Sequence, residues 1–171
     1  DLCKQGSAFV NKIWNAYRLI DGWEVDKDRE QSKAAQVALD WYAHKFQQAL
    51  ADIEHNFEKY RISDVLMSTY KLVWDDFCSR LLEMLKPPYG EPVSAATKTG
   101  VISLLEENLK LLHPFVPFVS EEIWRRLPGT QGSIMRAAFP NRSDAYGTTV
   151  ARDTAMEEKM ALVTGAISGV R

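Results

Sequence analysis

The sequence predicts an all-α fold: an antiparallel helical bundle with a short irregular or β excursion before its last helix. Apolar residues recur at intervals of three and four along most of the 171 residues, which is the period of an amphipathic helix. Residues 46–60 alternate steps of four and three, which is typical of a helix packed in a bundle. Pro87-Pro88 and Pro128-Gly129 divide this pattern into helix-sized lengths. We therefore expect about five main helices.

The first half of the chain predicts two helices separated by the polar run of residues 26–31. The first helix has one wide apolar face and fades near Asp21-Gly22, because glycine disfavours a helix interior. That face comprises Phe9, Ile13, Trp14 and Tyr17. The inward seam of the second helix comprises Phe46, Leu50, Ile53, Phe57 and Tyr60.

A third helix should run from about Asp64, capped by Ser63, to Pro87-Pro88, where proline stops it. Its inward residues are Val65, Leu66, Tyr70, Val73, Trp74, Phe77, Leu81 and Leu85. After a turn-rich stretch at residues 87–94, a fourth helix follows. Its apolar stripe comprises Val101, Leu104, Leu105, Leu109 and Leu112.

The fourth helix should stop at His113, because Pro114 disfavours helical geometry at the residue before it. Ser120 can then cap a short helix over residues 121–127. Glu121 and Glu122 fall in its first turn, where exposed N–H groups favour carboxylates.

The chain divides into a bundle at residues 1–128, a linker at residues 129–151 and a last helix at residues 152–171. Within the linker, residues 133–140 could be extended for a short length. Thr154 and Glu157 have capping-box spacing at the start of the last helix. The chain begins abruptly and ends inside a helical pattern, so we expect an excised piece of a longer protein, its last helix being the truncated start of a C-terminal portion.

Composition limits the function classes. The formal net charge is −2, so no global basic field drives nucleic-acid binding, and any RNA contact must come from a local patch. Cys3 and Cys78 are too few for a disulfide framework or a thiolate zinc site, and they fit a reducing, cytoplasmic location. Apolar runs are too short to span a membrane.

Neither a catalytic residue nor a metal site is expected in this piece. Walker-type, G-x-G-x-x-G and G-x-S-x-G strings are missing from the sequence. A di-iron bundle needs Glu-x-x-His pairs, but His44 and His113 lack the glutamate, and only Asp52 stands three residues before His55. Cys78 adjoins Phe77, which indicates a packed thiol rather than a nucleophile.

Four strings, in order, carry a family resemblance: N-K-I-W-N-A-Y-R at 11–18, Y-K-L-V-W-D-D-F-C at 70–78, L-L-H-P-F-V-P-F-V-S-E-E-I-W at 111–124 and I-S-G-V-R at 167–171. They resemble the anticodon-binding domain of class I aminoacyl-tRNA synthetases for branched aliphatic amino acids, and look most like the valine branch. Arg80-Leu81 stands where the family usually has Trp-Tyr, and Trp41 where it usually has a basic residue.

The resemblance implies a parent enzyme that joins L-valine to its tRNA with ATP and magnesium, whereas this piece holds the anticodon stem-loop and binds no cofactor. The HIGH-like and KMSKS-like catalytic motifs do not occur here. The implied partners are a valine tRNA and the other domains of the parent, not DNA or a membrane. The same domain of an isoleucine or leucine enzyme is one alternative. A non-enzymatic helical interaction module is another, but it leaves the four ordered strings unexplained.

RNA loops are bound by aromatic stacking, arginine planes and hydrogen bonds to base edges. Lys12, Asn15 and Arg18 step by three along the first helix and supply charge, an amide for a base edge and a guanidinium for a phosphate or base. Trp23, after the turn at Asp21-Gly22, is a further candidate as a stacking platform. The alternatives are that Asn15 ties down a neighbouring helix, Arg18 forms a surface ion pair and Trp23 covers the end of the core.

Overall fold

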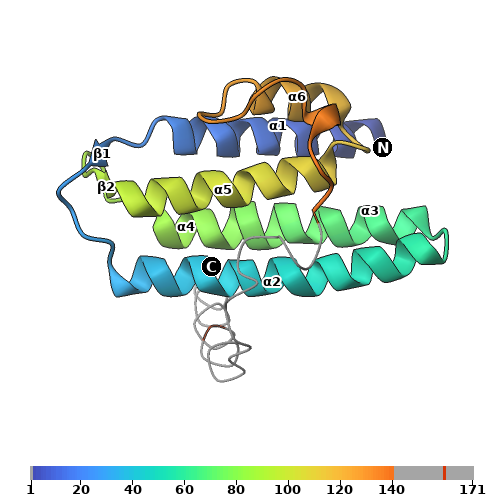
Figure 1. Cartoon of the computed structure of the whole chain (residues 1–171), viewed down its shortest axis with the longest axis horizontal. Coiled ribbons are helices and arrows are strands. Elements are labelled where there is room, and N and C mark those ends of the chain that lie inside the picture. The colour runs from blue at the N-terminus through green and yellow to red at the C-terminus, as the bar shows by residue number, and fades with distance from the viewer. Residues whose placement is uncertain (1, 141–159, 161–171) are drawn as a thin grey trace.

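The computed structural model describes residues 2–140 and residue 160, and it confirms the predicted helical bundle (Figure 1). Successive long helices run in opposite directions, and α6 returns across the bundle beside α1. The α-helices are α1 (Leu2–Asp21), α2 (Lys33–Glu58), α3 (Ile62–Lys71), α4 (Leu82–Leu85), α5 (Ala95–Leu112) and α6 (Pro117–Trp124). A π-helical segment, η1 (Leu72–Leu81), joins α3 to α4, and a 3-10 turn, η2 (Ile134–Arg136), follows α6. No helix in the described part of the chain has the length and apolar character needed to cross a membrane.

Two short strands, β1 (Val25–Asp26) and β2 (Val93–Ser94), close one end of the bundle (Figure 1). They pair in parallel, with Val25 opposite Val93. Lys98 adds to this closure because its Nζ donates to the carbonyl oxygens of Asp21 and Trp23, at 3.0 and 2.8 Å. These bonds satisfy the carbonyl of Asp21, the last residue of α1, and that of Trp23 in the turn that follows.

The core is largely apolar, and Tyr42 and Asn108 form a polar pair inside it. Tyr42, Phe46 and Phe77 are its largest fully buried side chains. The Tyr42 hydroxyl donates to Asn108 Oδ1 at 2.7 Å, and Asn108 Nδ2 donates to the carbonyl of Leu104 at 2.8 Å. These buried polar groups are therefore paired, as their burial requires.

Helix ends set by proline are where we expected them, whereas both predicted serine caps are wrong. α5 ends at Leu112, and α4 ends at Leu85 before Pro87-Pro88. However, α3 begins at Ile62, so Ser63 lies inside the helix. α6 begins at Pro117 because proline is already shaped for a first helical position, and it ends at Trp124. Ser120 is consequently buried inside α6, its Oγ 2.9 Å from the carbonyl oxygen of Val116.

Two residues predicted to point inward, Tyr60 and Leu66, are exposed, and four more are half-buried against the core: Trp14, Phe57, Tyr70 and Trp74. Tyr60 is 89% exposed and lies beyond α2, with a positive φ of 58° that ends the helix. Leu66 is 39% exposed because Val65 and Thr69, four residues apart, take the buried positions of α3. Trp74 is half-buried within η1, where i→i+5 hydrogen bonds shift the faces away from a regular 3.6 period.

The excursion after α6 is irregular through residue 140. Residues 134–136 form a 3-10 turn, so the extended chain expected over residues 133–140 is wrong at those positions. The rest of the predicted linker and the predicted last helix lie outside the described residues, apart from Met160, which is helical and buried. At the positions that depart from the family strings, Arg80 is exposed and bonded to Asp76, while Trp41 and Leu81 are buried.

Candidate functional site

The three candidates on α1 form a diagonal stripe rather than a compact site. An advance of three residues turns an α-helix by about 300°, so two such steps rotate the stripe by about 120° around the axis. Lys12 is consequently half-buried beside η1, whereas Asn15 and Arg18 lie on the exposed face. The three residues predicted together from their spacing therefore lie in different environments.

Lys12 is held by an internal contact between α1 and η1. Its Nζ donates to Ser79 Oγ at 2.7 Å and lies 4.4 Å from the ring centroid of Trp74. Ser79 in turn donates to the carbonyl of Trp74 at 2.8 Å. Lys12 therefore joins two helices, a role that sequence reasoning missed because Ser79 is 67 residues away.

Asn15 and Arg18 are available to a ligand. Both are exposed, and Arg18 lies in the last turn of α1, toward the end closed by β1 and β2 (Figure 1). Neither side chain forms a hydrogen bond or ion pair with another residue of the range 2–140, so neither the interhelical tie nor the surface ion pair considered as an alternative occurs there. An unpaired amide and guanidinium on one face can bind base edges and phosphates without first breaking another contact.

Trp23 is not an exposed platform. It is 6% exposed and belongs to the core, so the expected stacking surface is wrong and the alternative, that it covers the end of the core, is correct. The Lys98 bond to its carbonyl holds the turn after α1 against the start of α5. Burial of the large apolar ring outweighs any exposure that its place in a turn would suggest.

On its other flank, α1 meets α6 through a second pair of an aromatic ring and a cation. The guanidinium of Arg126 lies 5.4 Å from the ring centroid of Trp14, and its Nε donates to Glu122 Oε1 at 2.8 Å. The Trp14 and Tyr17 rings are 5.6 Å apart. Burial, helped by the charge of Asp21, raises the pKa of Tyr17, so this hydroxyl stays neutral at physiological pH.

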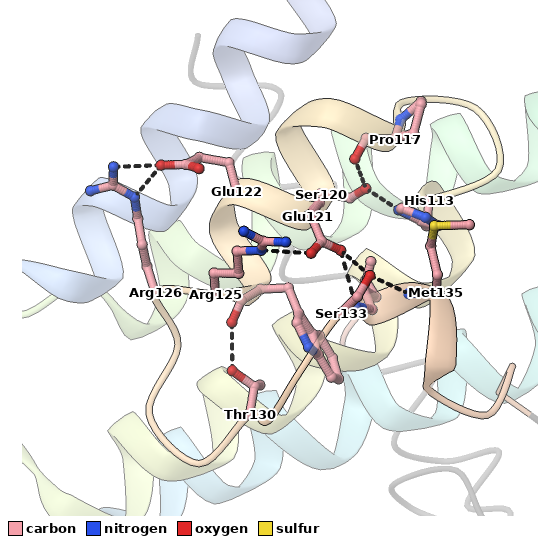
Figure 2. Close-up of polar contacts among 12 residues, drawn as sticks. His113, Pro117, Ser120, Glu121, Glu122, Arg125, Arg126, Thr130, Ser133 and Met135 are labelled. Carbon is pink, nitrogen blue, oxygen red and sulfur yellow. Dashed lines mark hydrogen bonds and ion pairs between the residues drawn. The ribbon is translucent and has the colours of Figure 1, made fainter.

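Figure 2 shows the polar contacts that hold α6 and the following segment together. Glu121 accepts from Arg125 Nε at 2.7 Å, from Ser133 Oγ at 2.9 Å and from the backbone N–H of Ile134 at 3.0 Å. The hydrogen bond from Arg125, with those from Ser133 and Ile134, lowers the pKa of Glu121. His113 Nδ1 lies 2.8 Å from Ser120 Oγ. The Glu121 carboxylate therefore accepts the hydrogen bonds that hold residues 133 and 134 against α6.

Cys78 is partly buried and packs against the core. Burial raises the pKa of the Cys78 thiol to about 12, so it is protonated at neutral pH, in agreement with its predicted place among packed side chains. No cluster of three or more histidine, cysteine, aspartate or glutamate side chains suited to a metal ion occurs within residues 2–140 and 160.

Comparison with known proteins matches these observations to a family. Residues 40–171 match the family described as the anticodon-binding domain of tRNA ligase. The valine–tRNA ligase of Christiangramia forsetii is 60% identical over 127 residues, covering 74% of this chain and 14% of that protein. The valine–tRNA ligases of Parabacteroides distasonis and Bacteroides thetaiotaomicron are 40% and 41% identical, each covering 99% of this chain and 19% of the relative. The chain thus spans less than a fifth of the length of these relatives. Its motifs, its helical bundle and these matches agree, and the chain belongs to the anticodon-binding domain family of tRNA ligases.

Proposed function

We propose that this chain is the anticodon-binding domain of a valine–tRNA ligase and that it binds the anticodon stem-loop of a valine tRNA. The observation that carries the proposal is the similarity of the chain to two valine–tRNA ligases, 40% and 41% identical in alignments that cover 99% of the chain. The parent enzyme then joins L-valine to this tRNA in the cytoplasm, using ATP and magnesium bound in other parts of the polypeptide.

Arg18 and Asn15 are the proposed RNA contacts, because both are exposed on one face of α1 and neither is paired with another residue of the range 2–140. A guanidinium can fork onto a phosphate or stack on a base, and an amide can pair with a splayed base edge. With a formal net charge of −2, the chain has no overall attraction for RNA, so binding depends on such local groups. Lys12 acts indirectly in this proposal, by fixing α1 against η1.

The test is a titration of the isolated valine anticodon stem-loop, and of a scrambled loop, at two salt concentrations. Binding should weaken with salt by a slope of about −0.7 per phosphate neutralised. Arg18→Ala should weaken valine-loop binding by about 1–3 kcal/mol and narrow the difference between the loops if Arg18 contacts a base. Arg61→Ala is the matched control, since Arg61 is exposed at the α2–α3 turn, and should bind as the wild type does.

Each alternative predicts a different result. Equal weakening of both loops by Arg18→Ala would show a phosphate contact without base selection. Unchanged binding in a folded variant would place the anticodon elsewhere on the bundle. A preference for an isoleucine or leucine loop would overturn the valine assignment, and equal affinity for tRNA and other polyanions would favour a general interaction module.

A further inference from the structure

Residues of α6 and of the segment that follows it line an exposed apolar groove. Figure 1 shows α6 beside α1, away from the end of the bundle that β1 and β2 close. Its volume is about 680 Å³, and its walls include Phe118, Met135, Pro117 and His113. Phe118 is 89% exposed and Met135 is 79% exposed, so two large apolar side chains face solvent in one depression. Adjacent exposed apolar groups of this size mark interaction surfaces more often than isolated ones do.

The groove is built on firmly connected elements. Glu121 fastens residues 133 and 134 to α6, and Ser133 Oγ accepts the backbone N–H of Met135 at 3.3 Å (Figure 2). On the other wall, His113 is joined to Ser120. Phe118 and Met135 are thus presented by backbone that is already ordered, which lowers the entropy cost of binding a partner.

The charges at the groove favour a polypeptide over RNA. Within the groove, Glu121 pairs with Arg125 at 2.7 Å, and Glu122 of the groove wall pairs at 2.5 Å with Arg126, which lies outside the lining. These opposite charges cancel locally, so phosphates meet no excess of positive potential here. Arg125 uses Nε for Glu121 while its side chain remains 65% exposed, which leaves its outer nitrogens open to a carboxylate or a carbonyl.

We propose that this α6 groove docks another part of the same ligase polypeptide, lying outside these 171 residues. The occupant places an apolar side chain over Phe118 and Met135 and a carboxylate or backbone carbonyl on Arg125. This inference rests on the proposed function, because it requires a longer ligase: the chain spans at most 19% of the aligned relatives' length. Docking here leaves Arg18, in the last turn of α1, open to RNA.

Methionine oxidation in the full-length ligase tests whether the groove is covered. Without tRNA, hydrogen peroxide should oxidise Met135 at least about tenfold more slowly than in the urea-unfolded ligase, because a covered thioether is shielded from the oxidant. Phe118→Asp should restore fast oxidation of Met135. Tyr89→Asp is the matched control, since Tyr89 is fully exposed at a turn remote from the groove, and should leave Met135 protected.

Photocrosslinking identifies the occupant. With p-benzoylphenylalanine in place of Phe118, the full-length ligase should crosslink to a peptide outside these 171 residues. Fast oxidation of Met135 in the wild-type ligase would overturn the proposal, as would continued protection in Phe118→Asp. A crosslink to residues 141–171, protection that appears only with tRNA, or no crosslink outside the 171 residues would also overturn it. Stem-loop binding is measured separately, so failure here leaves the proposed function intact.

Discussion

The two flanks of α1 use the same combination, a cation over a tryptophan ring, in different environments. Toward η1, Lys12 lies over Trp74 and donates to a neutral hydroxyl in a half-buried contact. Toward α6, Arg126 lies over Trp14 and pairs with Glu122, and these two charged side chains are 52% and 50% exposed. A partly desolvated amine needs its acceptor, whereas an exposed ion pair competes with water and gains little.

The aromatic surroundings increase the difference. On the η1 flank, the ring centroids of Phe9 and Tyr70 are 4.8 Å apart. The rings of Tyr70 and Trp74 stack with their centroids 5.5 Å apart and an angle of 13° between their planes. On the α6 flank, Trp14 meets Tyr17 at 5.6 Å and 51°. We infer that the η1 flank stabilises the bundle, whereas the α6 flank is more tolerant of change. The predictions that follow test this contrast.

The largest expected effect concerns cysteine reactivity on the η1 flank. Because burial raises the pKa of Cys78 to about 12, only about one molecule in ten thousand carries its thiolate near pH 8. Iodoacetamide near pH 8 should therefore modify exposed Cys3 and leave Cys78 intact, as peptide mass spectrometry can measure. Comparable labelling of both cysteines in the folded chain would show that η1 opens readily and would contradict a rigid flank.

The raised pKa of Cys78 also determines the direction in which stability changes with pH. A thiol kept neutral by folding contributes stability that is present below its ordinary pKa of 9.0 and is lost as pH rises toward about 12. Lys12 opposes the effect of burial on the Cys78 pKa. Lys12→Met should therefore make Cys78 still harder to alkylate at alkaline pH.

The next largest effect is the difference between Trp74 and Trp14 in how much each stabilises the chain, measured as the free energy of unfolding in urea. Trp74→Ala should cost about 2–3 kcal/mol, less than the roughly 3–5 of a fully buried tryptophan because Trp74 is half-buried. Trp14→Ala should cost about 1–2 kcal/mol, since it loses fewer ring contacts. Equal costs would remove the proposed difference between the flanks.

The features recovered from sequence are those that repeat locally. The seam of Phe46, Leu50 and Ile53 is fully buried, and prolines ended helices where expected, because periodicity and a missing N–H act at short range. Both predicted serine caps were wrong, because α6 already begins at Pro117 and α3 already begins at Ile62. No simple pattern of residue types marks the i→i+5 hydrogen bonds of η1.

The environment of the candidate site residues could be predicted only in part, for the same reason. Spacing placed Lys12, Asn15 and Arg18 on one stripe, but whether each is free depends on residues distant in sequence. Lys12 meets Ser79 from η1, and Trp23 is held by Lys98 from α5. Such contacts between distant residues follow from the tertiary fold and could not be read from α1 alone.

The smallest effects come from the polar pairs, and a matched pair of double-mutant cycles compares them. Lys12→Met with Ser79→Ala should give a coupling of about 1 kcal/mol, because removing either partner takes one hydrogen bond from a half-buried polar group. Arg126→Ala with Glu122→Ala should give only about 0.2–0.5 kcal/mol, as exposed i,i+4 pairs do. Added salt should lower the second coupling and leave the first nearly unchanged, since screening acts on exposed charge pairs. A larger, salt-insensitive coupling for Arg126 and Glu122 would mean that this pair is effectively desolvated, and the distinction between the flanks of α1 would then be wrong.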